Sequence, residues 1–418
     1  MSAFDVVEIC AGAGGQALGL EKAGFEHALA VELDSNACNT LRENRPSWKV
    51  AEGDVADIEV WDPAGSKGVS LLAGGVPCPP FTIAGKQLGS TDERDLFAWA
   101  VEQMEVVMPR ALLLENVRGL SMPRFAGYRQ HILDRLTELG YVAEWKLLQA
   151  SDFGVPQLRP RFVLVALRPD DAAYFAWPEP QGDPGTVGQA LEGLMGTHGW
   201  EGTAKWVQQA NKIAPTIVGG SKKHGGADLG PTRAKRAWAE MGVDALGIAN
   251  DAPHPGDKFE VGPKITTDMA ARLQGWLPSL GFDIDEWKIP ARKTSKYRQI
   301  ANAFPPPVAA AVGAAIIRAF RHEGSPVERT PLEHDPIYKV LKSANDFMTQ
   351  GQIIQAVGAS IDASEIERRI SLLSHDFDVE VRNGEAATAY RLGQFRAFTG
   401  QDDHARHELF LKHRARIS

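Results

Sequence analysis

The sequence predicts an α/β fold whose main domain is a Rossmann-like parallel sheet, followed by a loop-rich lobe and a small C-terminal module. Three observations support this. Short β-branched runs alternate with helical patterns over about the first 170 residues, as in parallel sheets with helical crossovers. Beyond residue 167 the chain becomes rich in Pro, Gly and Trp with weak periodicity. The last 80 or so residues have a helical pattern of their own.

The expected strands of the main domain are apolar runs that stop abruptly at glycine or polar residues. They cover residues 4–10, 27–33, 68–74, 110–116 and 161–167. The first, third and fourth of these lead into "CAGAGG", "GGVPC" and "ENV". Because ligands of open α/β sheets gather beyond the carboxyl ends of the strands, these three loops should share one rim.

The remainder of the chain divides at changes of composition. We expect a main domain of residues 1–170 plus 290–322, which includes a Pro-marked, alanine-rich helix within 302–320. The loop-rich lobe takes 171–289, with a helix at 266–276, and a polar linker takes 323–334. Residues 335–418 suggest three short helices and a hairpin around Asn383-Gly384. This pattern describes a winged-helix-like module, which could bind DNA or dock another protein.

Composition excludes several classes of protein. The 418 residues contain only three cysteines, without CxxC spacing, so neither a disulfide framework nor a structural zinc site is expected. No apolar run reaches the ~18 residues of a membrane span, and the N-terminus lacks the basic region of a signal peptide. We therefore expect a soluble cytoplasmic protein with no metal.

Local charge departs from the net charge of -8 in two basic stretches. One runs from Lys205 to Trp238, with Asp228 as its single acid. The other is "KIPARKTSKYR", residues 288–298. Either stretch is explained by a solvated surface or by contact with nucleic acid.

A glycine-rich turn follows the first expected strand. "EICAGAGG", residues 8–15, would let a ligand approach backbone N–H groups, although a tight strand-to-helix turn has the same appearance. Glu32 ends the next strand, where an acid can accept hydrogen bonds from ribose hydroxyls. Asp54 and Val55 could contact a purine in the same groove. Together these residues indicate an adenosine-containing cofactor.

Cys78 lies in an unusually stiff loop, "GGVPCPPFT". Its flanking prolines would restrict the backbone and hold the sulfur at a defined position. Such placement suits a thiolate nucleophile, and simple packing is the alternative.

Two further loops carry polar groups suited to binding a ring. Glu115 and Asn116 follow "ALLL", and a glutamate in a desolvated pocket can stay protonated and donate to a ring nitrogen. A capping acid would have the same position. Arg159 and Arg161 stand two apart in "QLRPRFVLV" and could hold a carbonyl or phosphate, unless they are exposed edge residues.

In their order along the chain, these motifs resemble those of the cytosine-C5 DNA methyltransferase family over about residues 4–320. The matching segments are "EICAGAGG", Glu32, "GDV", "GGVPCPPFT", "LLLENV", "QLRPR", "RLQGW" and "QIANAFPPPVA". The resemblance implies a Rossmann-like sheet that binds S-adenosylmethionine, with residues 171–289 as a target recognition domain. It also implies double-stranded DNA as substrate, and we expect a monomer, with a cognate restriction endonuclease as a candidate partner.

The resemblance also assigns roles to residues. Cys78 would attack C6 of a cytosine flipped out of the duplex, because a stacked base offers no open face to sulfur. Glu115 would support N3, and Arg159 and Arg161 would steady the oxygen side. The implied cofactor contacts are Cys10, Ala11, Gly12, Gly14, Gly15, Glu32, Leu33, Asp54, Val55, Pro77, Asn302 and Ala303. The implied substrate contacts are Asn116, Gln157, Lys222, Lys223, His224, Arg233, Lys235 and Arg236.

Three positions depart from the family pattern. Cys10 and Leu33 stand where the family often has aromatic residues, so stacking on adenine should be weaker or come from elsewhere. Pro79 replaces the usual glutamine after the nucleophile. Cys10 itself is expected to pack rather than to act as a second nucleophile.

Three other functions fit parts of the sequence. A related class methylates cytosine in transfer RNA with nearly the same motifs, but the long basic lobe and the C-terminal module favour DNA. A DNA-binding regulator without activity would not need Cys78, Glu115 and the arginine pair. A small-molecule Rossmann enzyme would leave both basic stretches unexplained.

Overall fold

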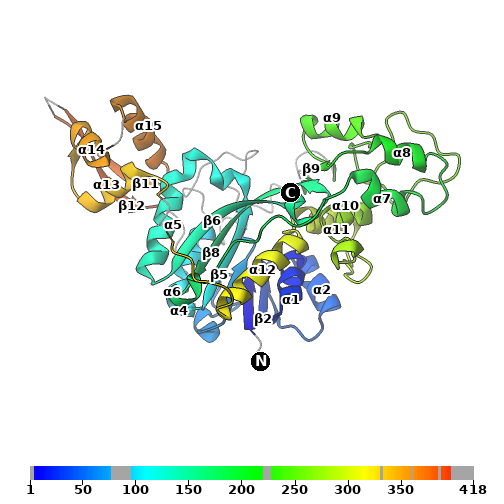
Figure 1. Cartoon of the computed structure of the whole chain (residues 1–418), viewed down its shortest axis with the longest axis horizontal. Coiled ribbons are helices and arrows are strands. Elements are labelled where there is room, and N and C mark those ends of the chain that lie inside the picture. Colours follow the sequence, from blue (N-terminus) through cyan, green and yellow to red (C-terminus); the bar gives the residue numbers. More distant parts are fainter. Residues whose placement is uncertain are drawn as a thin grey trace.

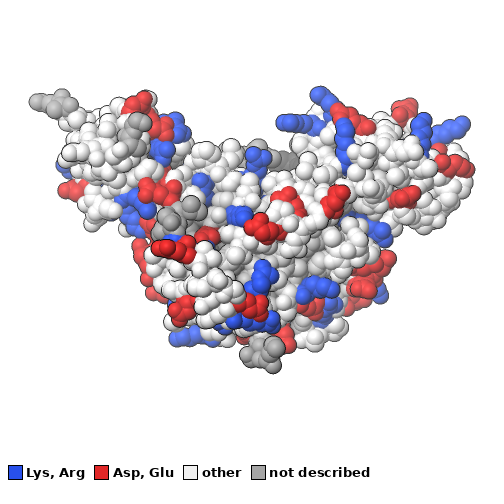
Figure 2. All heavy atoms as spheres, viewed as in Figure 1, with Lys and Arg blue, Asp and Glu red and all other residues white. Residues whose placement is uncertain are grey.

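The computed structural model describes residues 4–76, 96–219, 227–329, 333–358, 361–384 and 387–396. Figure 1 shows a base that contains the main sheet, with two smaller parts rising from its opposite sides. One is the loop-rich lobe, called the target lobe below (residues 171–289), and the other is the C-terminal module (residues 335–396). Figure 2 shows that the molecular surface is hollowed between them.

The base contains a seven-stranded sheet of order β3-β2-β1-β4-β5-β8-β6. Its strands are β1 (Phe4–Ile9), β2 (Phe25–Glu32), β3 (Val50–Glu52), β4 (Leu71–Gly74), β5 (Ala111–Val117), β6 (Val142–Gln149) and β8 (Pro160–Leu167). The first five strands are parallel, whereas β8 runs antiparallel to both β5 and β6. The predicted α/β fold with a large parallel sheet is confirmed, but strand β6 and the antiparallel direction of β8 were not predicted.

Helices cover both faces of this sheet because alternate residues of each strand point to opposite sides. Val6 of β1 packs in one core cluster and Val7 in another, and both are buried. The first cluster lies under α12 (Pro306–Phe320), and the second includes α3 (Leu96–Glu102) and α5 (Ala126–Glu138). Other helices in the described part of the base include α1 (Gly15–Ala23), α2 (Ser35–Asn44), α4 (Met104–Val107) and α6 (Pro169–Ala172).

Helices α1 and α12 pack closely because Gly19 has no side chain. A Cβ atom on Gly19 would lie 2.5 Å from the carbonyl oxygen of Pro306 and 2.6 Å from Cβ of Ala309. The C-terminal end of the main domain is thereby held against the helix that follows the glycine turn (Figure 1).

One helical stretch in the described part of the chain, Lys293–Phe320, has the length and mean hydropathy of a membrane span. It consists of two helices, α11 (Lys293–Asn302) and α12, with a break between them. In its most apolar window 72% of the residues are buried in the protein. The stretch is therefore accounted for as a core element.

The target lobe has little regular structure, in keeping with its weak periodicity. It contains α7 (Val187–Met195), α8 (Thr203–Gln209), β9 (Ala214–Pro215), α9 (Thr232–Glu240) and α10 (Thr267–Leu273). Strand β9 pairs in parallel with β7 (Gln157–Leu158), which ties the lobe to the base. The buried tryptophans Trp206, Trp238, Trp276 and Trp287 form much of the core that the lobe shares with α11.

The C-terminal module contains the three helices and the hairpin that the sequence predicts. Its elements are α13 (Pro336–Ala344), β10 (Met348–Thr349), α14 (Gln350–Val357), α15 (Ala363–Leu373), β11 (Phe377–Asn383) and β12 (Thr388–Phe395). The strands form an antiparallel sheet of order β10-β12-β11. Its description as winged-helix-like stays a prediction.

This module packs against α5 of the base. The ring of His131 lies among Tyr338, Phe377 and Phe395, with its centroid 4.0 Å from that of Phe395. A Cβ atom on Gly127 would lie 2.2 Å from Cδ2 of Leu373, so the two surfaces approach closely there. The module is therefore docked through a specific aromatic contact.

Candidate active site

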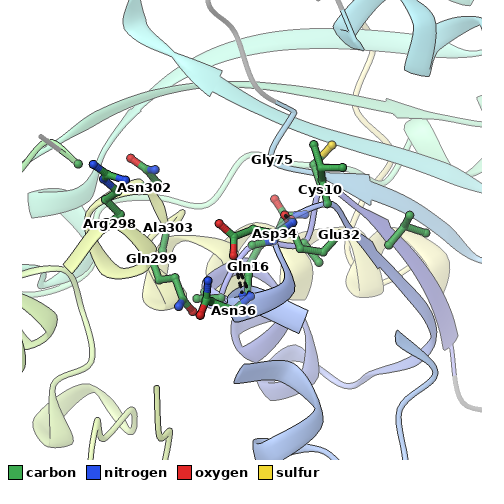
Figure 3. A pocket seen from close by; sticks show the side chains of 18 of the residues that line it. Cys10, Gln16, Glu32, Asp34, Asn36, Gly75, Arg298, Gln299, Asn302 and Ala303 are labelled. Carbon is green, nitrogen blue, oxygen red and sulfur yellow. Dashed lines mark hydrogen bonds between the residues drawn. The ribbon is translucent and has the colours of Figure 1, made fainter. Parts of the chain in front are cut away.

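A cavity of about 1030 Å³ opens at the carboxyl ends of β1, β2, β4 and β5. Figure 3 shows it between the glycine turn after β1 and helix α11. Residues Cys10 to Ala13, Gly75 and Glu115 all line it, so the three loops expected at one rim do lie together. Its volume is at the upper end of the range of about 300–1,000 Å³ typical of small-molecule sites.

The glycine turn is folded around Glu32. The N–H of Gly12 donates to Oε2 of Glu32 over 2.7 Å, and the N–H of Asp34 donates to Oε1 over 2.8 Å. Gly12 and Gly14 have φ values of 56° and 83°, which glycine adopts without steric cost. Burial raises the pKa of Glu32, while these N–H groups oppose that shift. Glu32 thus connects the turn to the end of β2 and still faces the cavity.

Most of the predicted cofactor residues surround this cavity. Its lining includes Cys10, Ala11, Gly12, Gly15, Glu32, Leu33, Asp54, Val55, Asn302 and Ala303. Gly14 differs, because a Cβ atom there would lie 2.5 Å from Cζ2 of Trp287 and the residue is absent from the lining. Glycine at this position permits the close packing of the Trp287 ring, and the predicted cofactor contact of Gly14 stays a prediction. Pro77 lies outside the described residues.

Cys10 has the conformation and environment of a packing residue. Its φ is 52°, an uncommon value for a residue with a side chain, and its side chain packs against the core beneath the sheet. Burial raises the pKa of the Cys10 thiol well above its ordinary value, and nearby Glu32 raises it further. A thiol held neutral in this way is a poor nucleophile.

Gln16 also lines the cavity but was not predicted. It is 3% exposed, and within the described residues neither atom of its amide has a hydrogen-bond partner. An unpaired buried amide is costly, so a ligand that pairs with it would be favoured. Arg298 of α11 lines the opposite wall (Figure 3). The glycine motif ends at Gly15, and nothing in the sequence shows that the side chain of the next residue, Gln16, points into the cavity.

Glu115 forms a close ion pair with Arg161. Nε of Arg161 lies 2.6 Å from Oε1 of Glu115, and both side chains are about nine-tenths buried. Burial raises the pKa of Glu115, while the guanidinium groups of Arg161 and Arg159 lower it in part. A Cβ atom on Gly75 would lie 3.4 Å from Oε2 of Glu115. Cys78 follows three positions later and lies outside the described residues.

Arg159 and Gln157 are placed differently from their predicted roles. Arg159 does not line the cavity, and its guanidinium donates to the backbone carbonyls of Ile217, Ala301 and Ala303. Gln157 is fully buried and its amide is used within the protein. Arg159 lies between β7 and β8 rather than within a strand, so the expected face shared with Arg161 does not form. In this structure both side chains are bonded within the protein, and their predicted contacts with substrate stay predictions.

Asn116 is also buried away from the cavity lining. Its Oδ1 accepts a hydrogen bond of 2.7 Å from the N–H of Val117. This bond shapes the chain immediately after Glu115.

The predicted DNA contacts divide into three groups. Lys222, Lys223 and His224 lie outside the described residues. Arg233 and Arg236 are exposed on α9, where Figure 2 shows Lys and Arg side chains on the lobe beside the hollow. Lys235 instead pairs with Asp228, with 2.7 Å between Nζ and Oδ2.

The arrangement as a whole combines two kinds of chemistry. Backbone N–H groups and acids at one end suit a nucleoside, and the buried carboxyl–guanidinium pair at the other suits a polar ring. The glycine turn, Glu32 and the carboxyl group of Glu115 all line one continuous cavity.

Comparison with known proteins agrees with this arrangement. The model of the C-5 cytosine-specific DNA methylase family matches residues 4–318. The chain is 65% identical over 419 residues to the type II methyltransferase M.NaeI of Lentzea aerocolonigenes, with 100% of both chains covered. It is 48% identical over 324 residues to the type II methyltransferase M.NgoMIV of Neisseria gonorrhoeae, covering 77% of this chain and 99% of that one.

A solved structure shows the same fold. That of a DNMT2 variant from Spodoptera frugiperda has a TM-score of 0.51 and 18% identity, and it covers 75% of this chain and 100% of its own. The chain therefore belongs to the C-5 cytosine-specific DNA methylase family.

Proposed function

We propose that this enzyme methylates C5 of a cytosine within a specific site of double-stranded DNA, with S-adenosylmethionine as methyl donor. The observation that carries the proposal is one cavity that holds both the Gly12–Glu32 turn and Glu115, with Gly75 of the chain leading to Cys78 on its rim. Binding of donor and target base in one cavity would bring the two reacting carbons together.

The residues of the cavity fit this donor. Glu32 retains lone pairs for ribose hydroxyls, and Asp54 and Val55 lie where a purine would reach them. The unpaired amide of Gln16 and the side chain of Asn302 are available to the amino acid end. When bound, the donor would supply an electrophilic methyl group.

In the proposed reaction, the Cys78 thiolate bonds to C6 of a cytosine flipped into the cavity. Glu115 supports the ring at N3, and Arg161 holds the Glu115 carboxyl in place. Attack at C6 makes C5 nucleophilic, and C5 gains the methyl group from the donor, which would leave as S-adenosylhomocysteine. The C5 proton then passes to water, and the electron pair of the C5–H bond re-forms the C5–C6 double bond as the sulfur–C6 bond breaks. This releases the methylated base and restores the Cys78 thiolate.

DNA would occupy the hollow between the target lobe and the C-terminal module. The exposed Arg233 and Arg236 of α9, together with Lys222, Lys223 and His224, would contact it from the target lobe. The similarity to M.NaeI and M.NgoMIV, both type II methyltransferases, supports a role in restriction–modification beside a cognate endonuclease.

Methylation of DNA is the direct test. The protein would be incubated with S-adenosylmethionine and plasmid DNA, and bisulfite sequencing would map modified cytosines. We expect one recurrent sequence to become methylated, with transfer RNA unmodified in a parallel reaction. Methylation of transfer RNA alone would overturn the assignment of DNA as substrate.

The covalent step has its own test. In the presence of S-adenosylmethionine, a duplex with 5-fluorocytosine at the mapped site should trap the protein in a complex that survives denaturing electrophoresis. Once C5 carries both fluorine and the methyl group, it has no proton to lose and the final elimination is blocked. The variant Cys78→Ser should neither methylate nor be trapped. Retained methyl transfer by that variant would contradict the proposed nucleophile.

A further inference from the structure

A cluster of three buried polar side chains joins the target lobe to the base. Gln157, Arg159 and Gln274, called the hinge cluster below, are 0%, 1% and 0% exposed. Gln157 belongs to β7, which pairs with β9, and Arg159 lies between β7 and β8. Gln274 follows α10, which leads the chain back from the target lobe. Nε2 of Gln157 donates to Oε1 of Gln274 over 2.8 Å, which joins the cluster.

On one side, the hinge cluster holds both backbone groups of Ile217. Its N–H donates to Oε1 of Gln157 over 2.9 Å, and its carbonyl accepts from Nη1 of Arg159 over 2.8 Å. Ile217 begins the short segment 217–219, called the entry segment below. This segment leads directly to Lys222, Lys223 and His224, which are among the proposed DNA contacts.

On the other side, the hinge cluster holds the backbone around Asn302. Nη2 of Arg159 donates to the carbonyls of Ala301 and Ala303 over 2.6 and 3.1 Å. Nε2 of Gln274 donates to the same Ala303 carbonyl over 2.6 Å. Asn302, between these two alanines, lines the cavity (Figure 3).

The two sides also meet directly. A Cβ atom on Gly219 would lie 2.5 Å from Oδ1 of Asn302, so the entry segment rests against the Asn302 side chain. A change in the position of the Asn302 side chain on cofactor binding would therefore also change the position of the entry segment. The planar guanidinium of Arg159 can hold three carbonyls in one geometry, whereas a lysine ammonium lacks such a rigid fork.

We propose that the hinge cluster couples the cofactor cavity to the DNA-contacting part of the target lobe, with Arg159 as a positioning residue. This inference rests on the proposed function, since it assumes that Asn302 contacts the cofactor and that the entry segment leads to DNA contacts. Coupling of this kind is reciprocal: the cofactor tightens DNA binding by the same factor by which DNA tightens cofactor binding.

The test measures that factor with S-adenosylhomocysteine, which cannot donate a methyl group. Dissociation constants for a duplex bearing the mapped site would be measured with and without saturating S-adenosylhomocysteine, in the wild type and in Arg159→Lys. We expect the wild-type ratio to lie within the usual range of about 5–150-fold. In Arg159→Lys the ratio should fall towards one.

A matched control separates coupling from general loss of stability. Arg129 is also a buried arginine, and its Nη1 donates to the carbonyls of Leu120 and Met122. Arg129→Lys should lower the melting temperature but leave the affinity ratio at its wild-type value. If Arg159→Lys does not fold, Gln274→Met provides the second variant, because it removes the bond to Ala303 and keeps the side-chain length.

The outcomes are distinct. A wild-type ratio of one, or an unchanged ratio in the Arg159 and Gln274 variants, would overturn the coupling. An unchanged ratio together with a lower kcat in Arg159→Lys would assign Arg159 to substrate instead. Failure of the wild type to bind S-adenosylhomocysteine at all would reject the proposed function.

Discussion

The carboxyl group of Glu115 lies 2.6 Å from the guanidinium of Arg161 in a buried pair, and Glu115 lines the same cavity as the glycine turn. The pair connects the end of β5 to the start of β8, two strands that run in opposite directions. Arg161 therefore orients the carboxyl group while also opposing the rise in pKa that burial causes.

Glu115→Gln should reduce the rate of methyl transfer without preventing cofactor binding. The amide has the same size but cannot exchange a proton with the base, and general acid–base groups contribute about 10²–10⁴-fold to rates. We expect a loss of that order in single-turnover rate. Binding of S-adenosylhomocysteine should change little, and a rate near that of the wild type would argue against a direct role for the carboxyl group.

Gln16→Leu should weaken cofactor binding without destabilising the free protein. The substitution removes a buried amide that has no partner in the described structure, and one lost hydrogen bond is worth about 1 kcal/mol. Calorimetry should show S-adenosylhomocysteine affinity reduced by about fivefold, which corresponds to about 1 kcal/mol. A lower melting temperature of the free Gln16→Leu protein would instead indicate a structural role for Gln16.

Gly19→Ala should destabilise the base by overpacking. The added methyl group would press against the backbone of α12, which cannot move without disturbing the core, and such insertions cost about 1–3 kcal/mol. Chemical denaturation would measure the change. Gly193→Ala is the control, because this helical glycine in α7 has open space around it and should gain about 0.5–1 kcal/mol.

Acid should loosen the C-terminal module. Burial among aromatic rings lowers the pKa of His131 to about 4 from an ordinary value of 6.5, so the unfolded state binds the proton more readily. The contribution of this contact to the free energy of unfolding is fully present above about pH 6.5. It declines by up to about 3 kcal/mol as the pH falls towards 4.

Limited proteolysis between pH 4 and 7 would follow release of the module. His334, whose pKa burial also lowers to about 4, contributes in the same window. His131→Phe should therefore reduce the pH dependence without abolishing it. The same pH dependence in wild type and variant would show that His131 is not a source of the effect.

Replacing both Arg233 and Arg236 by alanine should weaken DNA binding and its dependence on salt. Each phosphate contact releases counterions, so removal of two should lower the slope of log K against log salt by about 2. Fluorescence anisotropy at several salt concentrations would measure it. Lys67→Ala is the control, because Lys67 is exposed before β4, at the edge of the sheet opposite the cavity.

The location of the site followed from local sequence pattern. "CAGAGG", Gly75 and Glu115 each follow an apolar run, and parallel strands bring their carboxyl ends to one edge. Helix α12 begins at the predicted proline-rich start. The roles of Cys78, Lys222, Lys223 and His224 stay predictions, since these residues lie outside the described structure.

The partners of buried polar side chains could not be predicted in the same way. Arg159 and Arg161 look equivalent in "QLRPR", yet one binds backbone carbonyls at the hinge and the other binds Glu115. Gln16 follows the glycine turn without any mark of its inward orientation. The docking of the C-terminal module on α5 joins segments about 200 residues apart.

The sequence by itself determined the α/β class, the rim of the sheet and the chemical groups on it, because strand ends and turns depend on neighbouring residues. Only the tertiary structure decided the direction of β8, the packing of Gly14 against Trp287 and the different partners of Arg159 and Arg161. These depend on which distant surfaces meet, and periodicity reports which face of an element is buried but not what covers it.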